Sequence, residues 1–253
     1  MRVTFLGTGT SQGVPVIGCK CTVCQSLDYR DKRLRSSIHL LVGNTSIVVD
    51  TGPDFRAQML REHIERLDAI LFTHAHRDHT AGLDDVRAYN FLQQMDLPAY
   101  GTAMTLDQLR GDFAYAFQEH PYPGIPRLKL FEIDESPFQI GDITITPLPV
   151  MHLRLPVLGF RIGDFSYITD ANFIPESTLE RLQGTRTLVL NALQRESHIS
   201  HFNLEEALEI ARIVNAPVTY FTHISHKLGT HASVQTELPK SIFLAHDGLQ
   251  LEL

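Results

Sequence analysis

The sequence predicts an α/β protein in which strands dominate and lie in two sheets, with helices packed outside them. Two observations lead to this class. Short apolar runs recur along the chain with the composition of strands, and single amphipathic stretches of helical period fall between them. The 253 residues suffice for one core of this kind, and no repeat or linker divides them. We therefore expect one domain over residues 1–253.

The expected elements follow in chain order. Strands are predicted at 3–6, 38–42, 47–49 and 69–72, with a helix at 55–66 and an amphipathic stretch after His79. Further strands are predicted at 143–150, 160–162, 166–168 and 188–190. A helix at 204–214 precedes strands at 218–222, 242–245 and 249–253. Asn203 and Glu206 have the spacing of a capping box for that helix, and Asp247–Gly248 is expected to form a hairpin turn.

The chain is acidic and has no basic cluster. Lysine and arginine number 22 against 29 aspartate and glutamate, which gives a formal net charge of -7 with neutral histidines. This balance argues against a nucleic-acid groove, although bound metal could still attract a small anionic substrate. No apolar run reaches the roughly 18 residues of a membrane helix. Because glycine and threonine also interrupt the first residues before a signal peptide develops, we expect a cytoplasmic protein.

A histidine-rich segment follows the strand predicted at 69–72. It places four metal-capable side chains within six residues: His74, His76, Asp78 and His79. One divalent ion takes three or four protein ligands, so two ions need donors from elsewhere. Taken singly, a polar residue after a strand commonly caps the strand or lies on the surface. In company with the histidine-rich segment, three residues that follow apolar runs become ligand candidates: His152, Asp170 and His223.

The three cysteines form a second cluster. Cys19, Cys21 and Cys24 follow a glycine-rich stretch at residues 7–15. An odd, closely spaced set in a chain expected in the cytosol favours metal ligands over disulfides, with free thiols as the alternative. Three thiolates can hold one soft cation if a fourth ligand comes from elsewhere. The glycine-rich stretch lacks the lysine of a P-loop and is expected to be a tight turn.

The histidine-rich segment and its partners resemble the dinuclear ligand set of the metallo-β-lactamase superfamily over nearly the whole chain. This resemblance implies an αββα four-layer sandwich with the site at one edge of the two sheets. It also implies two divalent metals, manganese or zinc, of which one is held by His74, His76 and His152. The other is held by Asp78, His79 and His223, and Asp170 bridges the two. Asp50, in an Asp-x-Gly turn, is expected either to support the histidine-rich segment or to form the turn.

Within the superfamily, the sequence is most similar to the cyclic phosphodiesterases of the phosphonate pathway, the PhnP type. The features that carry this resemblance are residues 5–15, the cysteine cluster and the segment 222–226. In that family, three cysteines and the second histidine of the late segment bind a structural zinc. The resemblance therefore implies a zinc site on Cys19, Cys21, Cys24 and His226, and it also implies a homodimer. Aspartate at 170, in place of a cysteine, argues against an antibiotic-hydrolysing member.

The resemblance further implies hydrolysis by a hydroxide that bridges the two metals, which also stabilise the charge that develops on phosphorus oxygens. Asp78 is counted among the catalytic residues. The leaving alkoxide needs a proton, and the family's candidate acid is a histidine directly before the capped helix. This residue is His201, with His198 as the alternative. Residues 190–201 depart from the family's pattern, which leaves the substrate open.

We therefore predict a metal-dependent hydrolase of small or cyclic phosphodiesters, with a small anionic substrate and no nucleic-acid or membrane partner. A glyoxalase-type thiolesterase would leave the cysteines unexplained, and ribonuclease Z has a tRNA-gripping basic insertion that is absent here. A non-hydrolytic cofactor-biosynthesis protein of the same fold need not keep seven metal donors. Five histidines are expected to be ordinary surface or core residues: His39, His63, His120, His231 and His246.

Overall fold

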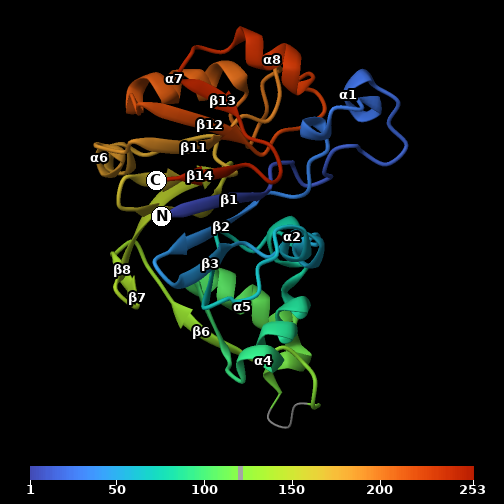
Figure 1. Ribbon diagram of the computed structural model, residues 1–253. Coiled ribbons are helices and arrows are strands. Elements are labelled where there is room, and N and C mark those ends of the chain that lie inside the picture. Colours follow the sequence, from blue (N-terminus) through green and yellow to red (C-terminus); the bar gives the residue numbers. More distant parts are fainter. Residues whose placement is uncertain (119–121) are drawn as a thin grey trace.

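The computed structural model describes residues 1–118 and 122–253 and shows two seven-stranded sheets (Figure 1). The first sheet has the order β14-β1-β2-β3-β4-β5-β6, and the second has the order β13-β12-β11-β10-β9-β8-β7. The first contains β1 (Arg2–Gly7), β2 (Ser37–Val42), β3 (Thr45–Val49), β4 (Ala69–Leu71), β5 (Leu97–Gly101), β6 (Leu128–Glu132) and β14 (Gln250–Glu252). The second contains β7 (Phe138–Ile140), β8 (Ile143–His152), β9 (Leu155–Ile162), β10 (Phe165–Tyr167), β11 (Thr187–Asn191), β12 (Val218–Thr222) and β13 (Ile242–Leu244). His120 lies outside the described residues.

Helices cover the outer face of each sheet (Figure 1). The first sheet is covered by α2 (Phe55–Arg61), α4 (Arg87–Gln93) and α5 (Ala103–Asp112). The second is covered by α6 (Glu176–Leu182), α7 (Leu204–Val214) and α8 (His231–Glu237). Two short helices belong to the segments that carry the metal-site candidates: α1 (Thr22–Gln25) and α3 (Arg77–Thr80). Three 3-10 helices span Tyr29–Asp31, Leu83–Val86 and Ala114–Phe117.

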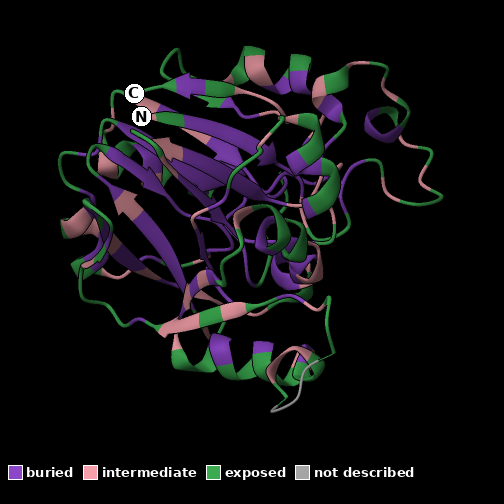
Figure 2. Ribbon diagram, turned by 60° about the horizontal axis from the view of Figure 1, so that its bottom comes forward, coloured by how far each residue is buried: buried purple, intermediate pink, exposed green. Residues whose placement is uncertain are grey.

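Alternating side chains divide the core into three layers. Phe5 packs into the cluster between the two sheets, whereas the next residue, Leu6, packs into the cluster under the helices of the first sheet. Such alternation is the period of a strand that is buried on both faces. A third cluster lies between the second sheet and its helices. The buried strands inside a partly exposed helical shell are visible in Figure 2, so the expected αββα sandwich is confirmed.

Parallel strands bring their carboxyl ends together. In the first sheet β3, β4, β5 and β6 are parallel neighbours, and in the second β10, β11, β12 and β13 are. Loops at the carboxyl ends of such strands commonly carry functional residues in α/β proteins. His74 follows β4, Asp170 follows β10, and His223 follows β12. The candidates therefore lie at the edge where loops from both sheets meet.

Most of the expected elements are present, and three expectations need correction. The helix expected at 55–66 ends at Arg61, because His63 adopts a left-handed backbone with φ 51°. Asp247–Gly248 is a turn but not a hairpin, since the strands on either side, β13 and β14, belong to different sheets. Strand β9 begins at Leu155 rather than at 160. The sequence patterns also missed β5, β6, β7, α5, α6 and α8.

The two ends of the described chain meet at one edge of the first sheet. Strand β1 pairs with β14, and the amino group of Met1 donates a hydrogen bond of 2.7 Å to the carbonyl of Leu253. Figure 1 shows these ends on the side of the molecule opposite to α1. Among the described residues, no helix combines the length and apolarity that crossing a bilayer requires.

Candidate metal centre

The buried carboxylate of Asp50 organises the histidine-rich segment. Its Oδ1 accepts a hydrogen bond from the backbone N of Thr73 at 2.9 Å, and its Oδ2 accepts from Thr73 Oγ1 at 2.8 Å and His79 Nδ1 at 2.7 Å. Because a carboxylate only accepts, His79 carries a proton on Nδ1, so that when the ring is neutral its lone pair is on Nε2. These contacts are those of a support for the histidine-rich segment, the first of the two roles expected for Asp50.

The same reasoning places the ring proton of two further histidines on Nδ1. Thr73 gives its one hydroxyl proton to Asp50, so it accepts from His74 Nδ1, which lies 2.9 Å away. His152 Nδ1 donates to the carbonyl oxygen of Ser200 at 2.8 Å. In both rings the Nε2 lone pair is left for another partner. An outer hydrogen bond that fixes the tautomer in this way is typical of metal-ligating histidine.

Asp170 lies at the centre of the candidate site. Its Oδ2 is 3.2 Å from both His79 Nε2 and His223 Nδ1, and its Oδ1 is 3.1 Å from His201 Nε2. Three groups of metal-capable side chains, with ligand atoms within 4.8 Å of one another, share this residue. They are His74 with His79 and Asp170, His152 with Asp170 and His201, and Asp78 with Asp170 and His223.

His76 lies at the exposed border of the site. Its ring centroid is 4.6 Å from that of His74 and 5.2 Å from that of His152. Among the described residues, the groups with ligand atoms in close reach do not include His76, and they pair His74 with His79 rather than with His152. The structure thus brings all seven expected side chains to one place. Their division between two metals stays a prediction.

Backbone strain accompanies this convergence. Asp50, Asp170 and His223 have φ values of 66°, 55° and 55°, in the left-handed region that residues with a side chain rarely occupy. Strain of this kind is held in place only by surrounding contacts and concentrates at functional sites. Asn191 supplies such contacts behind Asp170, where its side chain exchanges two hydrogen bonds with the backbone of Ala171 at 2.8 and 2.9 Å.

The charges of the site favour a bound cation. Burial opposes a charge on His79, but Asp170, Asp50 and Asp78 together raise its pKa well above the usual value. Burial likewise opposes ionisation of Asp170, but His223 and His79 hold its pKa well below the usual value. The carboxylates of Asp170, Asp50 and Asp78 thus surround the His79 ring. Their ionised forms are stabilised by nearby positive charge, such as a bound cation.

The remaining rings are poised as neutral ligands. Burial lowers the pKa of His74 well below its usual value, lowers that of His223 to about 4 and also lowers that of His152. These rings are therefore neutral near pH 7, which is the form that binds metal. Within the described residues, Nε2 of His74 and Nε2 of His79 are buried without a hydrogen-bond partner. A buried polar atom in that condition is costly, and a metal ion would satisfy it, so the residues present fit a divalent metal centre.

His201 and His198 lie beside this centre. The ring of His201 is 4.5 Å from that of His152 and stacks on that of His223 at 4.9 Å, while its Nδ1 is 3.2 Å from His198 Nδ1. His201 is mostly buried and His198 is exposed. His201 is thus the histidine that reaches Asp170, with His198 behind it.

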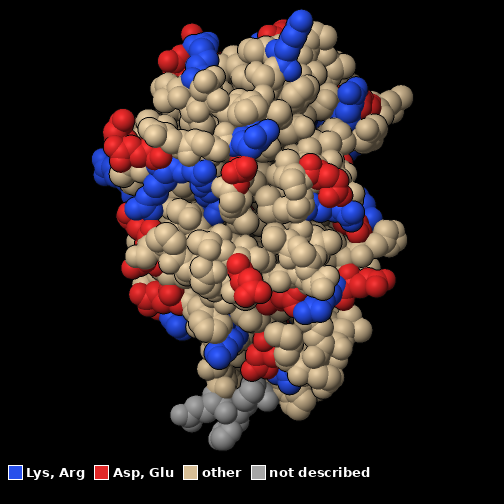
Figure 3. Space-filling view, turned by 60° about the vertical axis from the view of Figure 1, so that its left-hand side comes forward, with Lys and Arg blue, Asp and Glu red and all other residues tan. Residues whose placement is uncertain are grey.

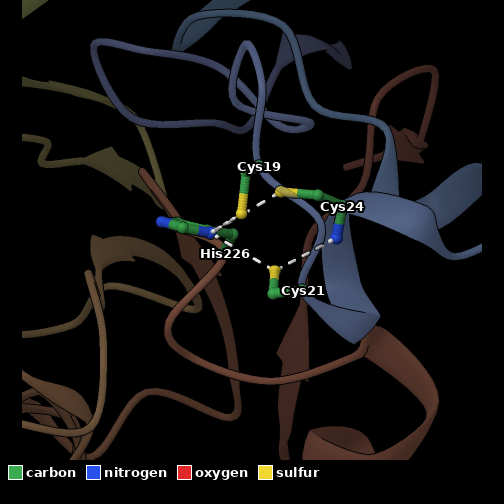
Figure 4. Close-up of side chains that lie close together, drawn as sticks. All are labelled: Cys19, Cys21, Cys24 and His226. Carbon is green, nitrogen blue, oxygen red and sulfur yellow. Dashed lines mark hydrogen bonds between the residues drawn. The ribbon is translucent and has the colours of Figure 1, made fainter.

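The three cysteines and His226 form a separate cluster, shown in Figure 4. His226 Nδ1 lies 3.3 Å from the Sγ of Cys19, 3.4 Å from that of Cys21 and 3.6 Å from that of Cys24. Tetrahedral zinc, with Zn–S near 2.3 Å and Zn–N near 2.0–2.1 Å, separates sulfur from nitrogen by about 3.6 Å. The four side chains expected to share one zinc therefore lie at a suitable spacing.

Backbone amides help to stabilise thiolate at this cluster. The amide of Cys24 donates to Cys21 Sγ, and this bond together with His226 lowers the pKa of Cys21 to about 6. Burial raises the pKa of Cys24 to about 11, although the amide of Val16 donates to its sulfur. A bound cation would remove that burial cost, because a coordinating thiol is deprotonated. Cys19, Cys21 and Cys24 are all free in the structure.

The sequence reasoning missed the groups that hold the candidate ligands in place. Ser36 donates its hydroxyl proton to the carbonyl of Gly9 and lies 3.2 Å from His223 Nδ1, so it accepts from that ring. The carbonyl of Ser200 and the side chains of Thr73 and Asn191 have comparable roles. No local pattern marks Ser36, Ser200 and Asn191, because each contacts a partner that is distant in sequence, and Thr73 is oriented by the distant Asp50.

The fold and the site together define a protein of the metallo-β-lactamase class. Residues 45–224 match the family model described as the beta-lactamase superfamily domain, and the chain belongs to this superfamily. Its structure is similar to a solved structure described as a new diphosphatase from the PhnP family. The TM-score is 0.94 with 39% sequence identity, over 100% of this chain and 97% of that one. The expected resemblance to the PhnP type is thereby confirmed.

Two curated relatives extend this comparison. An octanoyltransferase of Porphyromonas gingivalis is 41% identical over 99% of this chain, but the chain spans only 51% of that protein's length. A ribonuclease Z of a Mycobacterium species is 27% identical over 100% of this chain and 96% of its own. The name of the first relative describes a protein about twice as long, so half of that relative has no counterpart here.

Proposed function

We propose that this protein is a dinuclear metal-dependent hydrolase of small or cyclic phosphodiesters. The observation that carries the proposal is the arrangement around Asp170, where three groups of metal-capable side chains share one carboxylate. A shared carboxylate suits two adjacent cations, and paired divalent ions activate water and stabilise charge on both the attacking and the leaving oxygen of a phosphate ester. The similarity to a PhnP-family diphosphatase and to ribonuclease Z, both named for phosphorus chemistry, supports it.

The side chains take the following roles in this proposal. His74, His76 and His152 would hold one cation, Asp78, His79 and His223 would hold the other, and Asp170 would be shared between them. Two divalent cations bring four positive charges against the two carboxylates, so the site attracts an anionic phosphate although the whole chain has a net charge of -7. Asp50 keeps the His79 lone pair directed at the site through its 2.7 Å bond to Nδ1.

His201 is placed to donate the proton that the leaving oxygen needs. Its Nε2 reaches the centre of the site, 3.1 Å from Asp170 Oδ1, and its ring stacks on His223. Its Nδ1 faces the Oγ of Ser200 and the exposed His198, through which the ring can exchange protons with solvent. Because His201 also groups with His152 and Asp170 at ligand distance, its role must be separated from metal binding.

The alternatives differ in what they leave unexplained. A thiolesterase could use the same seven ligands but gives no reason for the cysteine cluster. A non-hydrolytic binding protein gives no reason for His201 at the centre of the site. For a ribonuclease Z-like activity a basic chain would be expected, whereas the net charge is -7. On the side of the chain ends, which Figure 3 turns forward, acidic and basic side chains are interspersed. Cleavage of a diphosphate is favoured as a second activity by the similarity to the PhnP-family diphosphatase.

A parallel assay distinguishes these activities. The purified protein with manganese or zinc is offered a bis-aryl phosphate, a cyclic ribose phosphate, a dinucleoside diphosphate and a thioester. We expect turnover of the two diesters. Turnover of the diphosphate alone would shift the proposal to diphosphatase, and turnover of the thioester alone would overturn it.

Elemental analysis tests the metal content. It should find about three metals per chain, and one or fewer in freshly isolated, unchelated protein would contradict the dinuclear site.

His201→Ala tests the proton donor. We expect turnover of a diester with a poor alkoxide leaving group to fall by about 100-fold or more, while metal content stays unchanged. A diester with a nitrophenolate leaving group needs little protonation and should be affected less. His198→Ala is the matched control in the same loop. Loss of metal in His201→Ala would instead place this residue among the ligands.

A further inference from the structure

Four two-residue turns in the described part of the chain join neighbouring antiparallel strands and begin with a left-handed residue. The turns between β2 and β3, β7 and β8, and β9 and β10 begin with Gly43, Gly141 and Gly163, whose φ values are 59°, 56° and 57°. The turn between β8 and β9 begins with Leu153, whose φ is 57°. Glycine adopts this conformation freely, but leucine is strained in it. One hairpin therefore lacks the residue that its own turn favours.

This strained turn directly follows His152, a candidate metal ligand. Leu153 is 52% exposed as a residue, so burial in the core does not compensate the strain. The contact that fixes the turn comes from another segment: Asn172 Oδ1 accepts a hydrogen bond of 2.7 Å from the backbone N of Leu153. The conformation next to His152 therefore depends on a residue 19 positions away in sequence.

Asn172 also contacts a third segment. Its backbone N donates to the carbonyl of Met151 at 2.9 Å, and its Nδ2 donates to the carbonyl of Ile199 at 3.2 Å. Asn172 lies two residues after Asp170. It thereby connects the Asp170 segment to the hairpin that carries His152 and to the segment that carries His201. The bond of 2.8 Å from His152 Nδ1 to the Ser200 carbonyl lies beside these contacts.

We propose that Asn172 is a positioning residue that clamps the strained Leu153 turn to the His201 segment and so fixes His152 and His201 relative to Asp170. The kinetic part of this inference rests on the proposed function. The clamp acts on groups that face the reacting phosphate and does not itself contribute to substrate affinity. Its loss should therefore lower kcat more than it changes KM.

Three variants test the clamp by kinetics. Asn172→Ala removes both side-chain bonds and should lower kcat for a diester with an alkoxide leaving group by about 10-fold to 100-fold, with KM changed by less than about threefold. Asn172→Asp keeps the acceptor for Leu153 and loses the donor to Ile199, so it should have an intermediate kcat. Asn44→Ala is the control, since Asn44 is an exposed residue in the glycine turn between β2 and β3, and it should match the wild type.

A second substitution tests whether the strained turn is what Asn172 holds. Leu153→Gly makes the left-handed turn favourable without a clamp, so in the Asn172→Ala background it should restore at least about a third of the lost activity on a logarithmic scale. A general loss of structure in Asn172→Ala would not be restored in this way. Absence of any restoration, with both proteins folded, would overturn the proposal.

Hydrogen exchange provides a readout that does not depend on activity. The amide of Leu153 should exchange at least about tenfold faster in Asn172→Ala than in the wild type, and close to the wild-type rate in Asn172→Asp. Unchanged exchange in Asn172→Ala would show that the clamp does not exist. If the wild type turns over no diester while exchange responds as expected, the proposed function fails and the clamp stands.

Discussion

A single carboxylate, Asp50, determines where protons lie on two candidate ligands. It accepts directly from His79 Nδ1, and through Thr73 it makes the hydroxyl an acceptor for His74 Nδ1. Both rings then offer an Nε2 lone pair to the same buried space. An amide in place of the carboxylate would offer a donor as well as an acceptor, and a donor that faces His79 would move the ring proton to Nε2.

Asp50→Asn should therefore weaken metal binding while preserving the shape of the site. We expect the affinity for the more weakly held active-site metal to fall by about 10-fold to 100-fold, which is the typical cost of losing an outer partner of a ligating histidine. Competition with a fluorescent chelator would measure it. An unchanged affinity would show that Asp50 acts only as a turn-forming residue.

His39 gives a pH dependence that is separate from the metal centre. It is buried on β2, and its Nε2 lies 2.8 Å from Ser46 Oγ. Burial, with a contribution from Arg2, lowers its pKa from 6.5 to about 4. Between these values the unfolded chain binds the proton and the folded protein does not, so protonation favours unfolding. The stability that depends on neutral His39 is present above pH 6.5 and is lost as the pH falls towards 4.

The loss attributable to His39 is at most about 3.5 kcal/mol, since its pKa changes by about 2.5 units and one unit corresponds to about 1.4 kcal/mol. Urea unfolding of the wild type and of His39→Gln at pH 7 and pH 4.5 would measure it. We expect the glutamine variant to lose less free energy of unfolding than the wild type over this interval. Equal losses would mean that His39 is not the group responsible.

At the scale of elements, α7 shows how a helix start is coupled to the site. Asn203 Oδ1 accepts from the backbone N of Glu206, and the Glu206 carboxylate accepts from the backbone N of Asn203, both at 2.9 Å. This capping box follows His201 by two residues and fixes the point at which the loop becomes a helix. The cap therefore contributes both to the helix and to the geometry of the loop before it.

Asn203→Ala should lower the free energy of unfolding by about 1 kcal/mol, which is the usual cost of losing such a cap. Asn203→Asp keeps the accepting oxygen and is the matched control, with an expected change of a few tenths of a kcal/mol. Thermal unfolding of both variants against the wild type tests this. Equal stability of the alanine variant and the wild type would contradict a stabilising role of the cap.

The same elements show what the sequence could predict. The bounds of α7 and β12 agree with the expected ranges, because a capping box and a marked amphipathic period define the former and a β-rich apolar run defines the latter. The sequence pattern predicted too long a helix for α2, because Ile64 packs against the same cluster as the helix although the helix has already ended at Arg61. Strand β6 is only partly buried, with no fully buried residue to produce a clear pattern. Weak burial therefore accounts for part of what was missed.

The residues of the candidate site likewise fall into those that the sequence could predict and those that it could not. The seven candidate ligands could be proposed from sequence because four metal-capable side chains within six residues form a distinctive pattern, and two ions need further donors from other strand ends. The residues that orient them, such as Ser36 and Asn172, are common polar types whose role depends on contacts across 187 and 27 positions. Such contacts arise only from the pairing of sheets and loops, which a local pattern does not contain.

At the scale of the whole molecule, the candidate centre draws ligands from both sheets. The histidine-rich segment follows β4 of the first sheet. In the second sheet, His152 is the last residue of β8, and Asp170 and His223 follow β10 and β12. A metal ion held by both groups would connect the two halves of the sandwich. Binding to the folded state alone stabilises it by mass action, by about 2.7 kcal/mol at a free metal concentration 100 times Kd.

Removal of metal should therefore lower the thermal unfolding temperature of the whole protein. We expect chelation to reduce Tm by several degrees and added manganese or zinc to restore it, with unfolding remaining a single transition. Calorimetry before chelation, after it and after restoration would measure this. A Tm that does not respond would show that the centre contributes no connection between the sheets.

The contact between Met1 and Leu253 has a consequence for how this fold can be rearranged. The two ends are adjacent in space, so a short peptide could join them into a closed ring, and new ends could be opened in an exposed turn such as Gly43–Asn44. The joined edge lies across the molecule from α1 and the cysteine cluster (Figure 1). Circular permutants joined at this edge should therefore keep the candidate metal-binding side chains together, because the site depends on the fold and not on the order of segments along the chain.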